Sequence, residues 1–385
     1  MIVQPIVGLF SDGTWTRMGR RIPYILGGSV ISALALALMP NCPRLLAFAP
    51  LAMGAFILLF MDLSFNITMQ PFRALVADML DDSQKTQGYV VQTFLINLGA
   101  VVGAVLPLVM TWLGVSDEAA PGHVPAHISY SYYAGGAILL LTVLVTSFRT
   151  REYPPREFAR YNNLPETDGA KPAGFSDLMR NVPPVMIRLG ITQFFSWAAL
   201  FLMWTYLKPA ITGVVTDHAT GEILSAGATQ TWVGVLNGTY PVPACIAALF
   251  LGRIAARYGN KPVYAVCLAT GALGFAGLCL LRDQYALMLP MAGIGIAWAG
   301  ILAMPYAILS RAVEPRRMGV YMGIFNFTIT IPQIVIGLTG GAIVKYCFGS
   351  QAPAMLALAG VFMLLAALSV GFIREQAAPQ PDSDK

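Results

Sequence analysis

Residues 284–310, QYALMLPMAGIGIAWAGILAMPYAILS, contain no charged side chain. As an α-helix, at about 1.5 Å per residue, this stretch would be about 40 Å long, whereas the hydrocarbon core of a bilayer is about 30 Å thick. The stretch is therefore long enough and apolar enough to cross a membrane as one helix. Ten uncharged runs of this kind occur in the chain, at residues 24–43, 45–61, 86–116, 119–148, 189–207, 223–252, 262–281, 284–310, 318–344 and 346–373.

The composition of the whole chain leads to the same conclusion. Of its 385 residues, 56% are apolar and 11% are charged, whereas about a quarter of the residues in an average soluble protein are charged. This deficit of charge excludes a soluble globular protein. The fold class that we predict is all-α, a polytopic helical membrane protein with ten complete spans.

The basic residues collect on one side of the predicted topology. If the segment around Arg17 is cytoplasmic and each run crosses the membrane once, 19 of the 24 Lys and Arg residues fall in connections on the cytoplasmic side. Cytoplasmic loops of membrane proteins carry such an excess. We therefore expect a multi-pass protein of the inner, cytoplasmic membrane whose C-terminus is cytoplasmic. The net charge of +5 then reflects topology and is no indication of nucleic-acid binding.

An internal repeat divides the chain into two halves. GLFSDGTWTRMGRRIPY at residues 8–24 is similar to GRIAARYGNKPVY at 252–264, and PFRAL at 71–75 is similar to PYAIL at 305–309. Repeats of this kind are common in transporter folds. We predict an N-terminal helical half at 1–148, a cytoplasmic linker at 149–183, a C-terminal helical half at 184–373 and a cytoplasmic tail at 374–385.

The two halves differ in length ahead of the repeated segment. In the second half, the 68 residues 184–251 precede Gly252, which is enough for two spans, whereas only seven residues precede Gly8. We therefore expect a protein of six plus six helices from which helix 1 and most of helix 2 are absent.

Several segments resemble the major facilitator superfamily. QPIVG at 4–8, followed by SD at 11–12 and GRR at 19–21, is similar to the loop after helix 2 in that superfamily, and most of all in its sucrose and maltose proton symporters, of the glycoside–cation type. QPFRALVAD at 70–78 and QFFSW at 193–197 are similar to the same branch. The resemblance implies the major facilitator fold and proton-coupled transport of a disaccharide.

Asp62 is an acidic residue embedded in an apolar stretch. Placing a charge at the centre of a membrane helix costs about 2.5–3.5 kcal/mol on insertion scales, and burial disfavours the charged form of a carboxylate. Asn66, Gln70 and Arg73 follow at spacings of 4, 8 and 11 residues, which predicts one polar stripe along a helix. The resemblance implies that Asp62 carries the coupled proton, with Arg73 in the same site. The alternative is a structural Asp62 that pairs with Arg73 or is capped by neighbouring helices.

A second group of charges lies in the predicted cytoplasmic loops. Asp12, Arg17, Arg20 and Arg21 occur close together in one predicted loop, and Asp78 lies in the predicted cytoplasmic connection at 71–87. Mixed charges can connect neighbouring helix ends, and an aspartate is stabilised at a helix N-terminus. The resemblance implies that these five residues form a gate that favours the outward-open state. The alternative is that the arginines only anchor the loop at the membrane surface.

Amide and aromatic side chains on several predicted helices suit a sugar. Aromatic faces pack against the C–H face of a pyranose, and amides form hydrogen bonds with its hydroxyl groups, as in other pockets built from few polar groups. The alternative is packing between helices, for which GAVVG at 99–103 and GLTGG at 337–341 are also typical. The candidate substrate-binding residues are Asn66, Gln70, Gln193, Trp197, Trp298, Asn326 and Gln333.

Other kinds of function have little support in the sequence. The chain has no Walker-type or dinucleotide-binding glycine motif, and its five cysteines and three histidines lack metal-ligand spacing. We therefore expect no enzyme, no cofactor and no metal site. The expected partners are a sugar, protons and the lipid bilayer, with no nucleic acid, and we expect a monomer. The alternatives are a proton-coupled transporter of another glycoside or amphipathic metabolite, and a non-transporting remnant or sensor.

Overall fold

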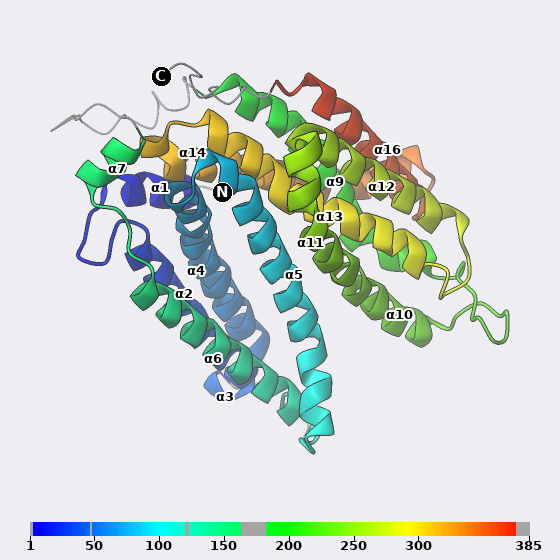
Figure 1. Cartoon of the computed structure of the whole chain (residues 1–385). Coiled ribbons are helices and arrows are strands. Elements are labelled where there is room, and N and C mark those ends of the chain that lie inside the picture. Colours follow the sequence, from blue (N-terminus) through cyan, green and yellow to red (C-terminus); the bar gives the residue numbers. More distant parts are fainter. Residues whose placement is uncertain (1–2, 47, 120–122, 163–181, 375–385) are drawn as a thin grey trace. The chain divides into compact units, whose positions relative to one another are not determined.

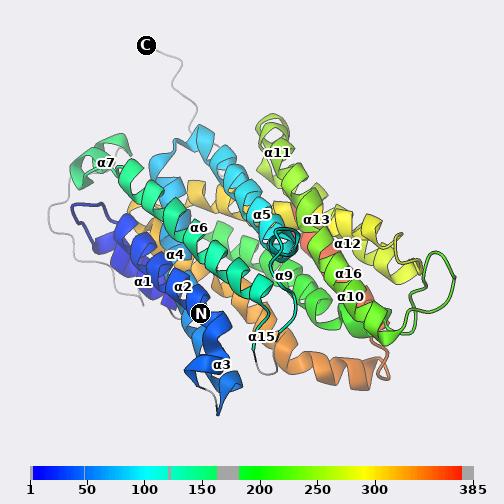
Figure 2. The same ribbon diagram turned by 90° about the horizontal axis from the view of Figure 1, so that it is seen from below.

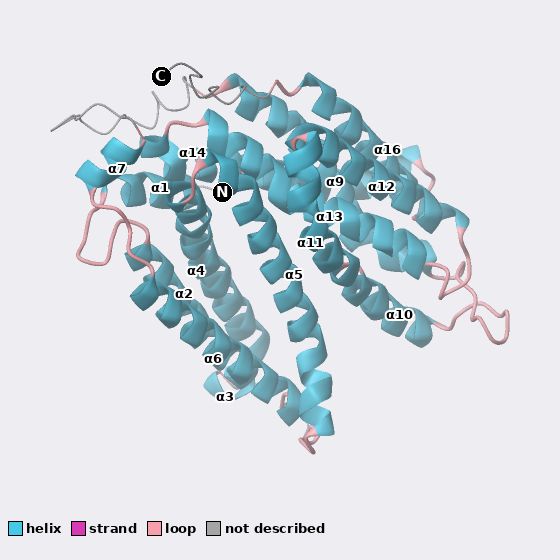
Figure 3. Cartoon of the chain, in the orientation of Figure 1, coloured by secondary structure: helices cyan, strands magenta, loops and turns pink. Residues whose placement is uncertain are grey.

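The computed structural model describes residues 3–46, 48–119, 123–162 and 182–374. Within these ranges the chain forms helices joined by loops and contains no β-strand (Figure 3). Ten of the described helical segments have the length and hydropathy to cross a membrane. This confirms the predicted all-α class and the predicted ten spans. The predicted tail beyond residue 374, and residues 163–181 of the predicted linker, lie outside the described residues.

The helices follow one another in the order that the colours of Figure 1 show. Three of the ten candidate spans join two or more elements: Ile22–Leu45, Ala226–Tyr258 and Pro315–Cys347. The α-helices are α1 (Val3–Gly13), α2 (Ile22–Leu38), α3 (Cys42–Leu45), α4 (Pro50–Met79), α5 (Asp82–Trp112), α6 (Ala126–Arg149), α7 (Pro155–Tyr161), α9 (Pro184–Ile211), α10 (Ala226–Thr239), α11 (Pro241–Tyr258), α12 (Asn260–Leu280), α13 (Met288–Ala312), α14 (Met318–Phe325), α15 (Phe327–Ala342) and α16 (Pro353–Ser369).

Proline and glycine set several helix boundaries. Pro184 and Pro241 occupy the first turns of α9 and α11, where the missing N–H of proline would have no helical partner in any case. Gly259 has a φ of 87° and separates α11 from α12. This left-handed conformation favours glycine because a Cβ atom would be strained there. The chain can therefore end one helix and begin the next within a single residue.

The helices form two compact units. Unit 1 contains residues 1–79, 102–180 and 314–326. Within it, α2 packs against α4 and α6 (Figure 2), and α1 packs against α4 and α14. Ile22 and Ile25 of α2 form a buried apolar cluster with Leu75 of α4, and Ser32 and Ser64 share a buried hydrogen bond of 2.8 Å between the same helices. Unit 1 therefore contains the N-terminal copies of the repeat, at residues 8–24 and 71–75, together with α14.

Glycines bring α1 and α14 into backbone contact. A Cβ atom on Gly8 would lie 2.3 Å from the carbonyl oxygen of Gly319, and one on Gly323 would lie 2.6 Å from Cα of Pro5. Real Cβ atoms do not approach other atoms so closely. Side chains at these two positions would therefore force the two helices apart.

The glycine motifs noted in the sequence behave differently. Among the described residues, no atom lies within 4 Å of a Cβ atom built on Gly99, Gly103 or Gly341, apart from the backbone of their own helices. A Cβ atom on Gly337 would reach only the ring of Phe201, at 3.8 Å. Within their own units, the described residues make no close helix contact at these positions, because spacing alone does not show which face a neighbouring helix covers.

Unit 2 contains residues 80–101, 181–313 and 327–385. Its helix α12 packs against α13 and α16, and α16 packs against α9. Gly274 of α12 allows this approach, since a Cβ atom there would lie 2.6 Å from the carbonyl oxygen of Pro290. Phe275 and Met363 are fully buried. Unit 2 thus has a dense core around α12.

The two compact units and the two predicted halves are different divisions of the chain. They assign residues 80–101 and 314–326 differently. The halves were defined by an internal repeat and stay a prediction.

Candidate functional site

Three predicted site residues on α4 belong to one hydrogen-bonded chain in unit 1. Asn66 Nδ2 donates to Asp62 Oδ2 at 3.2 Å and to the carbonyl oxygen of Asp62 at 2.7 Å. Gln70 Nε2 donates to Gln4 Oε1 at 2.7 Å, and Gln4 Nε2 donates to Asn66 Oδ1. Asp62 is exposed, whereas Gln70 is fully buried. The chain therefore leads from an accessible carboxylate into the interior.

Gln4 is the member of this chain that the sequence did not assign. It lies on α1 and is 3% exposed. The QPIVG segment contains it, but helical spacing on α4 carries no information about a contact from another helix. Arg73 lies further along α4 and is also buried, at 7% exposure.

The predicted gate residues form an ionic cluster, also in unit 1. Nε of Arg21 and a terminal nitrogen of Arg20 each lie 2.9 Å from Oδ2 of Asp78. Arg21 also forms an ion pair with Asp12 and donates to the hydroxyl of Ser11 at 2.6 Å. Burial alone would lower the pKa of Arg21, but the carboxylates of Asp12 and Asp78 outweigh it and raise that pKa above its ordinary value. Arg21 is therefore a permanent cation between two acids.

Asp12 connects this cluster to α14. Its two carboxylate oxygens accept hydrogen bonds from the backbone N–H groups of Gly319 at 3.0 Å and Val320 at 2.8 Å. The first N–H groups of a helix have no partner within the helix and favour a negative charge. Asp12 therefore caps α14 while it pairs with Arg21.

Two members of the predicted linker extend the cluster. Glu152 accepts hydrogen bonds from the backbone N–H groups of Arg21 at 2.8 Å and Ile22 at 2.9 Å, and so caps α2. The guanidinium of Arg20 lies 4.1 Å from the ring centroid of Phe158, a distance typical of a cation–π contact. Neither contact could be predicted from the sequence pattern. Arg17 lies outside the cluster, on the exposed turn between α1 and α2.

Aromatic site candidates meet in unit 2. The rings of Trp197 and Trp204 on α9 lie 5.4 and 5.9 Å from that of Trp298 on α13, and Tyr240, next to α11, lies 6.2 Å from Trp298. The planes of these three rings are close to perpendicular to that of Trp298, at 77–88°. Tyr240 was not predicted. We call these four residues the aromatic cluster.

Two buried donors beside the aromatic cluster have no partner among the described residues. They are Nε1 of Trp197 and Nε2 of Gln193. The Oε1 atom of Gln193 accepts from the hydroxyl of Tyr264 at 3.2 Å, which leaves the amide nitrogen as the unpaired end. Buried polar groups without a partner are rare, and an unbound ligand is one explanation for them.

The structure does not keep Asn326 and Gln333 on one continuous helix. Asn326 follows the last residue of α14, and its N–H donates to the carbonyl groups of both Met322 and Gly323. This tightened turn ends α14, and α15 begins at Phe327. Both residues still belong to one candidate membrane span, Pro315–Cys347, and their role in substrate binding stays a prediction. Asn326 belongs to unit 1 and Gln333 to unit 2.

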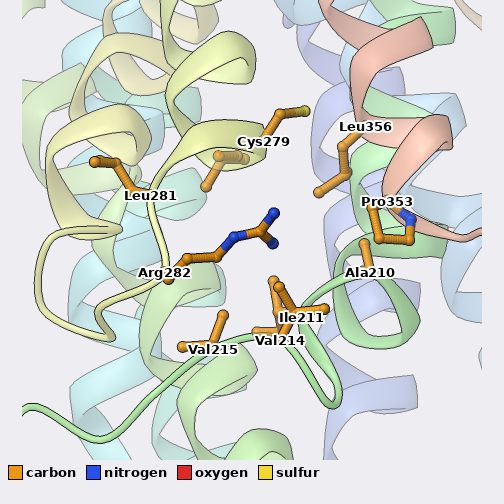
Figure 4. Close-up of a pocket in the computed structure, with 10 residues that line it drawn as sticks. Ala210, Ile211, Val214, Val215, Cys279, Leu281, Arg282, Pro353 and Leu356 are labelled. Carbon is orange, nitrogen blue, oxygen red and sulfur yellow. The ribbon is translucent and has the colours of Figure 1, made fainter. Parts of the chain in front are cut away.

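A hollow in unit 2 contains none of the predicted site residues. It lies between the ends of α9, α12 and α16, and its empty volume of about 260 Å³ is partly open to solvent. Figure 4 shows the guanidinium of Arg282 pointing into it between Ile211 and Leu356. Apart from Arg282, its walls are mainly apolar, so it offers few groups to sugar hydroxyls.

Comparison with known proteins identifies the family. The model of the family "MFS/sugar transport protein" matches residues 1–347. The chain belongs to this family. It is therefore a multi-pass membrane protein of a sugar transporter family, which agrees with the resemblance found in the sequence and with the expectation that it is not an enzyme.

Relatives and solved structures support this assignment. The chain is 26% identical over 400 residues to sucrose transport protein SUT5 of Oryza sativa subsp. indica, covering 89% of this chain and 72% of the relative. It is 23% identical to sucrose transport protein SUC4 of Arabidopsis thaliana, covering 92% and 77%. The structure of the fucose:proton symporter FucP of E. coli covers 98% of this chain and 88% of its own, with a TM-score of 0.71 and 15% identity. That structure shows the shared fold.

Proposed function

We propose that the protein is a symporter that couples proton influx to the uptake of a disaccharide of the sucrose or maltose class, by alternating access. It acts as a monomer in the cytoplasmic membrane, with its linker and C-terminus inside the cell. The sugar transporter family and the relatives named as sucrose transport proteins support the disaccharide. The two site groups described above supply the chemistry.

The observation that carries the sugar proposal is the pair of unpaired donors next to the aromatic cluster. Nε1 of Trp197 and Nε2 of Gln193 are buried without a partner among the described residues, and the rings of Trp204 and Trp298 lie 6.3 and 5.4 Å from that of Trp197. Sugar hydroxyl oxygens accept such hydrogen bonds, and the C–H faces of a pyranose pack on indole rings. A bound disaccharide would therefore accept hydrogen bonds from the two donors and pack against the indole rings. Asn66, Gln70, Asn326 and Gln333 remain further proposed substrate-binding residues.

Asp62 is proposed as the proton carrier. A carboxylate on a membrane-spanning helix is costly unless it has a function or a partner, and Asp62 is exposed while one of its oxygens accepts from Asn66. In the proposed cycle Asp62 exchanges its proton with water when the transport pathway opens to one side of the membrane. Arg73 is the proposed basic member of this site. Asp12, Arg17, Arg20, Arg21 and Asp78 are proposed as the gate, which holds α1 to α14.

Transport assays in proteoliposomes test this function. A proton gradient should drive the accumulation of labelled sucrose or maltose, and unlabelled glycosides of other classes should compete weakly. Asp62→Asn should abolish accumulation and keep sugar counterflow, which needs no net proton movement. Asp117→Asn, an exposed carboxylate in unit 1, is the matched control and should behave as wild type. Accumulation that ignores the proton gradient would refute the coupling.

The sugar site is tested by the apparent affinity in counterflow. Gln193→Leu should weaken it about tenfold, since an unpaired hydrogen-bonding group costs about 1–3 kcal/mol and 1.4 kcal/mol is a factor of ten. Tyr264→Phe removes one of the two hydroxyl groups that donate to Oε1 of Gln193, the other being that of Ser196, and should change the affinity by less than about twofold. Equal effects of the two variants would indicate a structural role for Gln193.

A further inference from the structure

The direction of the amide chain on α4 follows from its carboxylate end. An ionised carboxylate only accepts hydrogen bonds, so Asn66 must present its NH₂ group to Asp62. The carbonyl oxygen of Asn66 then faces Gln4, which must donate to it, and the carbonyl oxygen of Gln4 must accept from Gln70. The described bonds have this order.

At the far end of this amide chain, an acceptor atom has no hydrogen-bond partner. Oε1 of Gln70 is buried and has no hydrogen-bond partner among the described residues, and Gln70 is fully buried. No described partner therefore fixes the direction of the chain at Gln70, and the charge of Asp62 at the other end sets that direction.

Protonation of Asp62 would favour the opposite direction. The new O–H group can donate to Oδ1 of Asn66 once that amide has rotated by about 180°. The amides of Gln4 and Gln70 would rotate as well, so that Asn66 Nδ2 donates to Oε1 of Gln4 and Nε2 of Gln4 donates to Oε1 of Gln70. Nε2 of Gln70 would then take the position in which Oε1 now lacks a partner. No bond other than the O–H bond of Asp62 forms or breaks covalently, and the proton comes from water. Asn66 gives up its 2.7 Å bond to the Asp62 carbonyl, an oxygen that the helix backbone also uses.

We propose that Gln4 is a positioning residue for proton coupling, which reports the protonation state of Asp62 to α1 by reversing the direction of this amide chain. The proposal rests on the proposed function, because it assumes that Asp62 carries the proton. Gln4 is the only link of the chain that α1 supplies among the described residues. The same helix carries Asp12, which caps α14.

Backbone contacts make α1 able to respond. The carbonyl oxygen of Gln4 lies 2.7 Å from the position of a Cβ atom on Gly323, and Gly8 is in similar contact with Gly319. A change at Gln4 therefore acts on a helix that lies directly against α14.

Few other titratable groups are present on the elements packed against α4. Those described are Asp12 on α1, Tyr24 on α2, Cys42 and Arg44 on α3, and Tyr321 on α14, and α4 itself also carries Arg73 and Asp78.

One substitution interrupts the chain without adding charge. Gln4→Met has a similar volume to glutamine and no hydrogen-bonding amide. It should lower proton-driven sugar accumulation about tenfold, which corresponds to about 1.4 kcal/mol, while counterflow stays within twofold of wild type. Ser32→Ala is the matched control, because it removes a buried hydrogen bond between α2 and α4 outside the chain. It should leave both activities unchanged.

The outcomes separate the inference from the proposed function. If Asp62→Asn retains accumulation, the proposed function fails. If Asp62→Asn loses accumulation but Gln4→Met keeps it, with wild-type pH dependence, the proposed function stands and the role of Gln4 is refuted.

An infrared measurement covers the case in which Gln4→Met does not fold. Acidification of the wild-type protein should produce a carboxylic-acid band that Asp62→Asn lacks, together with changes in the side-chain amide bands that Asp62→Asn also lacks. A carboxylic-acid band from Asp62 without any amide change would overturn the proposal.

Discussion

The Asp12 cap on α14 supports a quantitative prediction. Asp12→Asn keeps a side-chain oxygen that can accept from Gly319 or Val320 but removes the charge that faces Arg21. Breaking a buried ion pair costs about 3–5 kcal/mol when the remaining charge is left alone. Arg21 keeps Asp78 at 2.9 Å, so we expect about 2 kcal/mol. Asp12→Ala also removes the cap, which adds about 1 kcal/mol.

Hydrogen exchange at the two capped amides measures this loss. The protection of the Gly319 and Val320 amides reports the free energy of local opening. About 2 kcal/mol corresponds to a protection about 30-fold lower in Asp12→Asn, and about 3 kcal/mol to about 150-fold in Asp12→Ala. Mass spectrometry of the protein in nanodiscs can follow the peptide that contains α14.

Glu314→Gln provides the matched control. Glu314 also precedes α14, but its ion pair with Arg317, at 3.4 Å, is largely exposed. Exposed pairs contribute about 0–1 kcal/mol, so protection should change by about twofold or less. If both Asp12 variants also stay within twofold of wild type, the cap does not hold α14 and the reasoning is refuted.

Two further predictions concern packing and pH. Gly8→Ala should destabilise unit 1 by about 1–3 kcal/mol, because its Cβ atom would meet the Gly319 carbonyl. Gly13→Ala is the control in thermal unfolding, since a Cβ atom there has no neighbour within 4 Å. Equal unfolding temperatures of the two variants would contradict the packing. Hydrogen bonds from backbone N–H groups lower the pKa of Asp217 and of Asp283 below the ordinary 3.8. The loop order that these carboxylates support should therefore be complete above about pH 4 and lost as the pH falls through the lowered pKa values. Hydrogen exchange at Ala219 and Ala286, corrected for intrinsic rates, should show this, and a loss already between pH 7 and pH 5 would argue against it.

The spans could be predicted from the sequence because they depend on a property that is local along the chain. A run without charge, such as residues 284–310, has few alternatives to a membrane helix, and α13 covers most of that run. The polar stripe on α4 was predictable for a similar reason, since helical periodicity places Asp62 and Asn66 on one face. Their hydrogen bond is consistent with that placement.

Contacts between elements could not be predicted in this way. Gln4 and Glu152 act on residues more than 60 positions away, and periodicity within one helix carries no information about such partners. The same limit explains the glycines, where GAVVG at 99–103 matched a packing motif but Gly8 and Gly319 make the close contact. Asn326 shows a different limit, because one tightened turn ended a helix that its flanking residues would have continued.

The backbone contact between α1 and α14 at their glycines affects how the two helices can slide along each other. Helices that interlock through side chains must climb over them to slide, and this gives the interface a few preferred registers. Gly8, Gly319 and Gly323 leave no such ridges at their contacts. At these points the hydrogen bonds from Gly319 and Val320 to Asp12, in place of interlocking side chains, hold the two helices in register. We expect the two helices to slide more easily when these bonds are released.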